Sequence, residues 1–246
     1  MNRITLASLI CSMTLLSPAV LADAGATDAK AILTKASNAF QSLKSYQFEG
    51  KSVSETTIGG KTSRTEVGYV VAYEAPNKLR LEYRYPTAGN WLRVSDGQYM
   101  LVRRTITKES RREPVTDRTL ETLSSSPIYA FQTLSDTADQ PLLKGSETID
   151  VGGKPVDCQV IQFATHPRQL MPGETSGTSK VWVDKQTGLV LREEISTSAT
   201  SGNSVSEGKR IITVDSFSVN GDLANDLFST APAAHQHESA SKHKGS

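Results

Sequence analysis

The sequence predicts a mainly β protein of the α+β class, built on one curved antiparallel sheet. After residue 45, apolar and polar residues alternate in one stretch after another, which is the period of a strand with one buried and one wet face. Short turns rich in glycine and aspartate join these stretches, so strands adjacent in sequence are expected to pair antiparallel. Only residues 28–45 show a clear helical spacing of apolar residues.

The first residues are typical of an exported protein. Arg3 supplies positive charge, an apolar run covers residues 4–16, and residues 20–22 (VLA) match the small-residue pattern of a signal peptidase site. The run is shorter than the roughly 20 apolar residues of a membrane span. We therefore expect a signal peptide over 1–22 and a soluble periplasmic protein that does not span the membrane, with an uncleaved anchor helix as the alternative.

Charge and cysteine content exclude several classes of protein. The chain has 27 Lys and Arg against 26 Asp and Glu, and removal of residues 1–22 takes away Arg3 and no acid. The neutral mature chain has no overall field that favours nucleic acid or an anionic membrane. Cys158 then remains as the single cysteine, so no intramolecular disulfide is expected. Its place in a strand pattern favours a buried, inert thiol over a nucleophile.

Residues 28–45 are expected to form the one long helix. Thr27 or Asp28 can cap its start. The apolar stripe of this helix has to pack on another apolar surface, and the aromatic sheet that follows offers one. The stripe consists of Ile32, Leu33, Ala36, Phe40 and Leu43.

A meander of strands follows the helix, and residues 77–102 are its most aromatic part. Apolar residues alternate with charged ones from Leu79 to Tyr85, and residues 95–97 (SDG) form a turn signal. One face of this sheet is therefore apolar and needs a cover of protein or of ligand. The expected strands are 46–55, 63–74, 78–85, 90–94 and 98–107.

Residues 108–118 (KESRREPVTDR) break the alternation and are expected to form a solvated loop. Together with the arginines just before it, this segment is locally basic. Arg104, Arg111 and Arg112 are candidate residues for binding an acidic partner, against the alternative of a plain solvated connection. Residues 119–134 are then expected to form one or two short helices, as a lid.

Strand patterns resume after the lid and end at residue 219, and residues 223–228 are expected to close the domain, so we expect a single domain over residues 27–232. Residues 233–246 are polar and expected to be disordered, and their histidines make a weak metal site conceivable beside an incidental tail. We assign no metal to them. The expected elements are strands at 147–151, 154–164, 179–184, 189–197 and 209–219, with loops at 166–177 and 198–206.

No catalytic constellation is visible in the sequence. HExxH, CxxC, GxSxG and a glycine-rich phosphate loop are all missing, and no motif surrounds His166, the one histidine of the predicted domain. Glu193 and Glu194 are adjacent in a strand and so point to opposite faces. We predict a protein that is not an enzyme and has no cofactor, and an enzyme with His166 or converging carboxylates in a cleft remains the third hypothesis.

An open, strongly curved sheet leaves a groove lined by large apolar side chains, which is the usual form of a lipid or acyl-chain site. The alternative is that these side chains form an ordinary core under the helix. The candidate groove residues are Val71, Leu81, Tyr83, Tyr85, Trp91 and Phe217.

Five phrases, taken in order, resemble the LolA/LolB/RseB-like superfamily of periplasmic lipoprotein carriers and envelope sensors. The resemblance covers about residues 28–232. The phrases are 43–46 (LKSY), 76–82 (PNKLRLE), 94–99 (VSDGQY), 181–192 (VWVDKQTGLVLR) and 227–232 (LFSTAP).

The resemblance implies an incomplete, half-open β-barrel with helices covering its concave side and a hydrophobic cavity for acyl chains. Our leading hypothesis is therefore a periplasmic, non-catalytic binding protein that shelters an acyl chain, a lipid or a lipoprotein. The alternative is an RseB-like sensor or interaction module that binds an envelope membrane protein through the basic segment 103–118 or a sheet edge. Carriers of this type latch with an arginine near the lid, and the resemblance leaves five candidates: Arg80, Arg84, Arg93, Arg103 and Arg104.

Overall fold

The computed structural model describes residues 18–116, 127–165, 174–201, 204–224 and 226–231. Its strands in the first half of the chain are β1 (Ser45–Ile58), β2 (Lys61–Glu74), β3 (Lys78–Tyr85), β4 (Gly89–Asp96), β5 (Tyr99–Arg104) and β6 (Glu109–Pro114). Those in the second half are β7 (Asp139–Val151), β8 (Lys154–Thr165), β9 (Glu174–Asp184), β10 (Val190–Ser201) and β11 (Ser204–Val219). The helices are α1 (Pro18–Gln41), α3 (Pro127–Phe131) and α4 (Leu134–Thr137).

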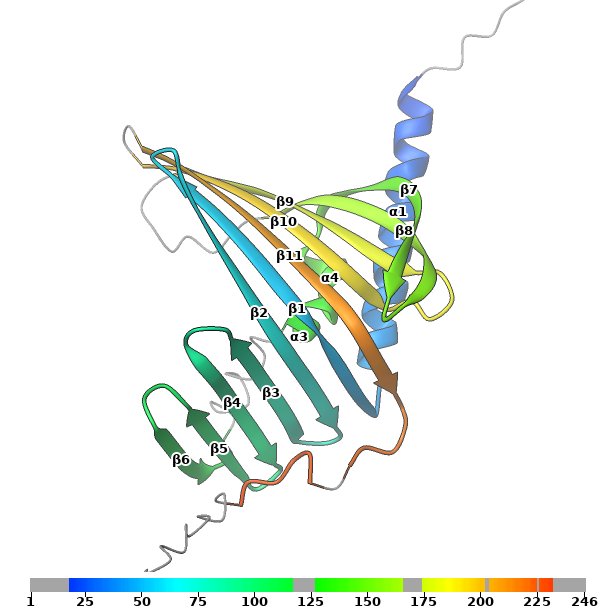
Figure 1. Ribbon diagram of the computed structural model, residues 1–246. Coiled ribbons are helices and arrows are strands. Elements are labelled where there is room, and N and C mark those ends of the chain that lie inside the picture. The colour runs from blue at the N-terminus through cyan, green and yellow to red at the C-terminus, as the bar shows by residue number, and fades with distance from the viewer. Residues whose placement is uncertain (1–17, 117–126, 166–173, 202–203, 225, 232–246) are drawn as a thin grey trace, which may run out of the picture.

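All eleven strands belong to one antiparallel sheet in the order β6-β5-β4-β3-β2-β1-β11-β10-β9-β8-β7 (Figure 1). Each half of the chain is a meander, and the two meanders meet where β1 pairs with β11, from Tyr46 opposite Val219 to Ile58 opposite Ser206. Over the described residues, β6 and β7 are the outer strands and do not pair with each other. The predicted mainly β, antiparallel and open sheet is confirmed.

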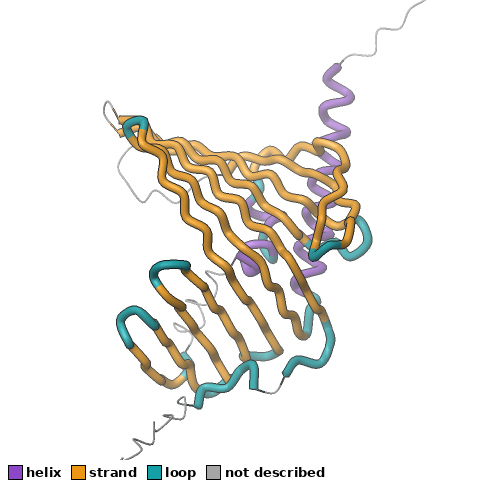
Figure 2. Tube along the Cα trace, viewed as in Figure 1, coloured by secondary structure: helices purple, strands orange, loops and turns teal. Residues whose placement is uncertain are grey.

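The three helices of the described residues lie on one side of the sheet (Figures 1 and 2). Leu33, Ala36 and Phe40 of α1 belong to the same buried cluster as Phe48 and Val71 of the sheet. Phe40 lies between Phe48 and Phe131 of α3, with ring centroids 5.9 and 5.5 Å away. Burial of a phenylalanine side chain contributes about 1.5–3 kcal/mol, so the helical stripe stabilises this core.

We call the side of the sheet that packs on the helices the helix-side face. The cross-strand register assigns each side chain to one face, because directly opposed residues point the same way. Val71 is opposite both Phe48 and Leu81, and Ile161 is opposite Val181. All of these residues belong to the buried cluster that includes α1, so they lie on the helix-side face. Any residue that is directly opposite one of them in a neighbouring strand lies on the same face.

Residues 226–231, the terminal segment, pack on the opposite face of β2–β4. Phe228 is buried against Ala72 and Val94. Arg80 Nη1 donates a hydrogen bond to the carbonyl of Leu227 at 3.2 Å, and the Thr230 hydroxyl donates one to Asp96. The predicted closing segment therefore covers an apolar patch that the helices do not reach.

Gly50 lies at a β-bulge in the pairing of β1 with β11, where the register shifts between Glu49 and Gly50. The Tyr69 hydroxyl donates a hydrogen bond across this bulge to the carbonyl of Thr213 at 2.9 Å. A Cβ atom at residue 50 would lie 1.9 Å from that same carbonyl oxygen. The close approach of two backbones explains why glycine is needed here.

Several predicted elements need correction. The helix begins at Pro18 and ends at Gln41 rather than covering 28–45. The predicted loop at 108–118 is wrong, because β6 pairs its backbone with β5, and charged side chains are compatible with an edge strand. The predicted loop at 198–206 is also wrong, because β10 and β11 continue pairing to Ser201 and Ser204.

Other predictions fall partly or wholly outside the described residues. The signal peptide lies outside them up to residue 17, as do His166, residues 117–126 of the lid region and the histidine-containing tail. Of the short helices expected at 119–134, α3 lies within the described part of that region, whereas α4 begins at its last residue, Leu134, and ends at Thr137. The helices described here include none that is both long and apolar enough to cross a membrane.

Candidate binding site

Four of the six candidate groove residues, Val71, Leu81, Phe217 and Tyr83, belong to the packed core or pack against it. Val71 and Leu81 have an exposed fraction of 0% and belong to the buried cluster that includes α1. Phe217 packs against the same cluster, and its ring stacks on that of Phe48 with centroids 5.9 Å apart. These contacts are those of an ordinary core under the helices, the alternative to a groove.

Tyr83 also forms a group with Tyr85 and Trp91 where β3 and β4 meet. Tyr83 is directly opposite Trp91 in the register, and the two rings stack with centroids 5.6 Å apart and planes inclined by 11°. The ring of Tyr85 lies 6.4 Å from that of Tyr83. Since Leu81 is on the helix-side face, Tyr83 and Tyr85 follow it there at the period of a strand.

A pocket of about 310 Å³ opens beside these rings, and we call it the aromatic pocket. It brings together Tyr85 and Trp91, expected in a groove, with Arg104, expected to bind a partner. Trp91 and Arg104 come together because they are directly opposite in the pairing of β4 with β5. The lining consists of Tyr85, Ala88, Gly89, Asn90, Trp91, Arg104 and Ile106.

Two guanidinium groups lie near the Trp91 ring. The guanidinium carbon of Arg93 is 4.2 Å from the ring centroid, and that of Arg104 is 5.9 Å from it. Arg111 is on the same face, because it and Arg93 are both opposite Val102. Burial lowers the pKa of Arg93, and the positive charges of Arg104 and Arg111 lower it further. The helix-side face of β4–β6 therefore concentrates positive charge beside an aromatic surface.

The predicted basic surface does not form one patch, because Arg111 and Arg112 are adjacent in β6 and point to opposite faces. Arg112 Nε donates to the Thr230 hydroxyl at 3.3 Å, and its guanidinium carbon lies 3.5 Å from the Tyr99 ring centroid. Arg112 thus helps hold the terminal segment, whereas Arg104 and Arg111 remain on the helix-side face. Their ion pairs with Glu109 and Glu113 measure 3.8 and 3.2 Å.

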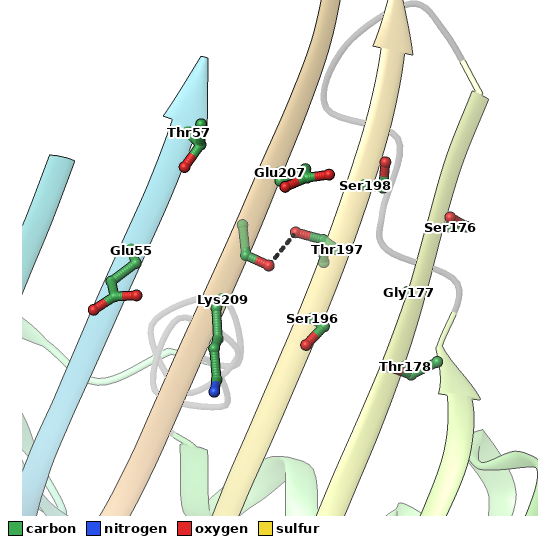
Figure 3. Close-up of a pocket in the computed structure, with 11 residues that line it drawn as sticks. Glu55, Thr57, Ser176, Gly177, Thr178, Ser196, Thr197, Ser198, Glu207 and Lys209 are labelled. Atoms are coloured by element: carbon green, nitrogen blue, oxygen red, sulfur yellow. Dashed lines mark hydrogen bonds between the residues drawn. The ribbon is translucent and has the colours of Figure 1, made fainter. Parts of the chain in front are cut away.

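A second cavity, of about 520 Å³, lies on the face opposite the helices, across β1, β11, β10 and β9 (Figure 3). Two cross-strand rows line it: Glu55, Lys209, Ser196 and Thr178 in one, and Thr57, Glu207, Ser198 and Ser176 in the other. Gly177, Thr197 and Gly208 complete the lining, with the Thr197 hydroxyl 3.5 Å from the carbonyl of Gly208. No apolar side chain lines this cavity, so it offers no shelter for an acyl chain.

The structure does not bring the adjacent carboxylates together. Glu193 is buried and accepts a hydrogen bond from Ser179, whereas Glu194 forms ion pairs with Arg192 and Lys209. In the described ranges, no three His, Cys, Asp or Glu side chains are close enough together to hold a metal ion.

No family model matches the chain, and a search of curated proteins gives no significant match. Solved structures resemble its fold. The Mycobacterium tuberculosis lipoprotein LppX is 15% identical with a TM-score of 0.46, over 80% of this chain and 98% of LppX. A chain of the Pseudomonas aeruginosa MucA/MucB complex is 19% identical with a TM-score of 0.40, over 83% of this chain and 61% of that one. A DUF1329 family protein from Desulfovibrio piger is 14% identical with a TM-score of 0.34, over 84% of this chain and 98% of that one.

These neighbours are members of the LolA/LolB/RseB-like fold, the group that the sequence resembles. Similarity at this level carries no argument about ligands or partners, so function has to be argued from the residues of this chain.

Proposed function

We propose that this protein is an exported, non-catalytic binding protein that shelters an acyl chain, a lipid or a lipidated protein against the helix-side face of its sheet. The aromatic pocket is the observation that carries the proposal. Tyr85, Trp91 and Ile106 give it an apolar lining, and Ile106 has an exposed fraction of 66%. Burial of an acyl chain contributes about 0.8 kcal/mol per CH₂ group, so apolar contacts alone can hold a long chain.

The position of the helices supports the same proposal. The main buried cluster joins α1, α3 and α4 to β1–β3 and to β7–β11, and it contains no residue of β4–β6. In this proposal the helices fill one part of the concave side of an incomplete barrel. The guest occupies the aromatic surface of β3–β5 beside them. The apolar leader at residues 4–16 supports export to the periplasm.

A fatty acid brominated on its chain provides a direct test, because bromine quenches tryptophan fluorescence only at short range. The chain has two tryptophans, and Trp182 is only 2% exposed, with its indole Nε1 donating to Glu147 at 2.8 Å. We expect the probe to quench delipidated wild-type protein and the Trp182→Phe variant. The Trp91→Phe variant should bind the probe without quenching.

Native mass spectrometry of protein purified from its own periplasm provides the second measurement, and a lipid-sized adduct is expected. A ligand-free mass together with no uptake of the brominated fatty acid would contradict the proposal.

The second candidate function is an interaction module that binds an envelope membrane protein, and the edge strand β6 favours it. Over the described residues β6 pairs only with β5, so its other side presents backbone groups to which a partner strand can add. Charge reversal at the exposed Arg111 should then abolish capture of that partner while fatty-acid uptake continues. Arg64, exposed at 62% in β2 and ion-paired with Glu55 and Glu66, provides the matched charge-reversal control.

A further inference from the structure

We infer that the aromatic pocket binds the anionic headgroup of an amphiphile, a phosphate or carboxylate group attached to an apolar chain. This inference rests on the proposed function and deepens it, because it assigns a polar end to the guest and places that end beside Trp91 and Arg104.

The first observation is an unsatisfied donor. The indole Nε1 of Trp91 is buried, and no hydrogen-bond acceptor reaches it among the residues that the structure describes. A buried N–H group without an acceptor destabilises the fold, and such groups are rare in folded proteins. Trp182 shows the ordinary case in this chain, since its Nε1 donates to Glu147 at 2.8 Å. If binding shifts the side chains that bury Nε1, an oxygen of the headgroup would satisfy Trp91 in the same way.

The second observation is the charge around that donor. Arg93 and Arg104 both place their guanidinium groups within 6 Å of the Trp91 ring centroid. Guanidinium groups bind phosphate and carboxylate oxygens through strong, charge-assisted hydrogen bonds. The ion pair of Arg104 with Glu109, at 3.8 Å, joins partly exposed side chains, and such a pair contributes little. Arg104 therefore retains donors for an incoming anion.

The third observation is that the lining combines this polar corner with an apolar one. Tyr85, Ala88 and Ile106 complete the wall of the same pocket, and Asn90 adds an amide. A free anion would leave the apolar wall unused, and a plain hydrocarbon would leave the Trp91 N–H unsatisfied. At about 310 Å³ the pocket is at the small end of ligand sites, large enough for a headgroup and the start of its chain.

Calorimetric titration with three probes tests the inference: dodecyl phosphate, dodecanol and inorganic phosphate. Dodecyl phosphate should bind at least about tenfold more tightly than dodecanol, the factor that one charge-assisted hydrogen bond provides. Inorganic phosphate alone should not bind measurably. Equal affinity for the two amphiphiles would overturn the inference, and tight binding of inorganic phosphate would reassign the pocket to a free anion.

Two variants locate the effect. Trp91→Phe keeps an aromatic ring but lacks the donor, and Arg104→Gln removes the charge. Each should weaken dodecyl phosphate binding about tenfold and leave dodecanol binding nearly unchanged. Arg64→Gln in β2 removes another exposed arginine, at 62% against 49% for Arg104, and should change neither affinity. Unchanged dodecyl phosphate binding in both pocket variants would contradict the inference.

Wild-type protein gives a readout that needs no variant. In a ¹⁵N spectrum, the Trp91 indole resonance should move downfield with dodecyl phosphate and not with dodecanol, while that of Trp182 stays in place. Failure of both amphiphiles to bind would reject the proposed function itself. Binding of both with equal affinity, and with no indole shift, would reject only the anionic headgroup.

Discussion

The Ser179 hydroxyl donates a hydrogen bond to Glu193 Oε1 at 2.8 Å, and both side chains are buried on the helix-side face. Burial raises the pKa of Glu193, and the Ser179 hydrogen bond and the Arg210 charge offset only part of this effect. The folded protein therefore binds this proton more tightly than the unfolded chain does. Above the unfolded-state pKa of a glutamate, the Glu193 carboxylate opposes folding.

Glu193→Gln is accordingly expected to raise the melting temperature at pH 7.5 by a few degrees, the shift that about 1 kcal/mol causes in a domain of this size. The gain should disappear near pH 3, well below the ordinary pKa of a glutamate, where the carboxyl is protonated in both states. Thermal unfolding followed by circular dichroism across this pH range provides the measurement. A lower melting temperature for the variant at pH 7.5 would show that the carboxylate stabilises the fold.

Glu82 is expected to behave in the opposite way. Burial alone would raise the pKa of Glu82, but hydrogen bonds from Arg80 and Arg84 outweigh it and lower that pKa. A lowered pKa contributes stability above the unfolded-state value, and this stability is lost as the pH falls through the folded-state value. Glu82→Gln should destabilise the protein by about 1.5–3 kcal/mol at neutral pH and by progressively less in acid. Urea unfolding at pH 7 and in acid checks both parts, and a pH-independent loss would rule out this charge effect.

Gly50→Ala should destabilise the protein by more than 1 kcal/mol, because the new Cβ would lie 1.9 Å from the Thr213 carbonyl oxygen and force two strands apart. Gly68→Ala in the neighbouring strand is the matched control, since its Cβ would meet Arg84 at an ordinary 3.7 Å. Denaturant unfolding of the two variants measures the difference. Equal stability of the two variants would mean that the bulge adapts to a side chain.

Cys158 should resist thiol reagents in the folded protein. It is fully buried, and burial, together with the negative charges of Asp184 and Asp157, raises its pKa to about 12. The thiolate is the reactive form, so labelling by a thiol reagent at pH 8 should be slow until denaturant unfolds the chain. Rapid labelling under native conditions would reveal local opening of the sheet.

Periodicity predicted the strands whose alternation separates apolar from charged residues. Residues 78–85 form β3 with the expected bounds, since leucine and tyrosine alternate there with charged side chains. The same criterion failed at β6, because Arg111 and Arg112 place a charged side chain on each face of this strand. Only its backbone pairing with β5 identifies β6 as a strand. Alternation shows which residues share a face of a sheet. It therefore cannot detect an edge strand that has no apolar face.

Three of the residues that line the aromatic pocket were named from the sequence, but their grouping was not predicted, and Ala88, Gly89, Asn90 and Ile106 were not named. Tyr85 and Trp91 were expected in a groove and Arg104 at a separate basic surface, and the β4–β5 register brings them together. Arg93 was missed as a neighbour of Trp91, although a spacing of two along a strand indicates a shared face. Val71 and Leu81 show the other limit, since sequence marks their face as apolar without showing that helices cover it.

The junction of β1 with β11 has a consequence for the order of folding. Each meander pairs only strands that are near in sequence, but the sheet becomes continuous only when β1 meets the last strand of the chain. Closing so long a loop makes this a slow, high-contact-order step. Synthesis must therefore reach β11 before β1 gains its second neighbour. Until then β1 remains an exposed edge that a chaperone, or a second unfinished chain, could pair with.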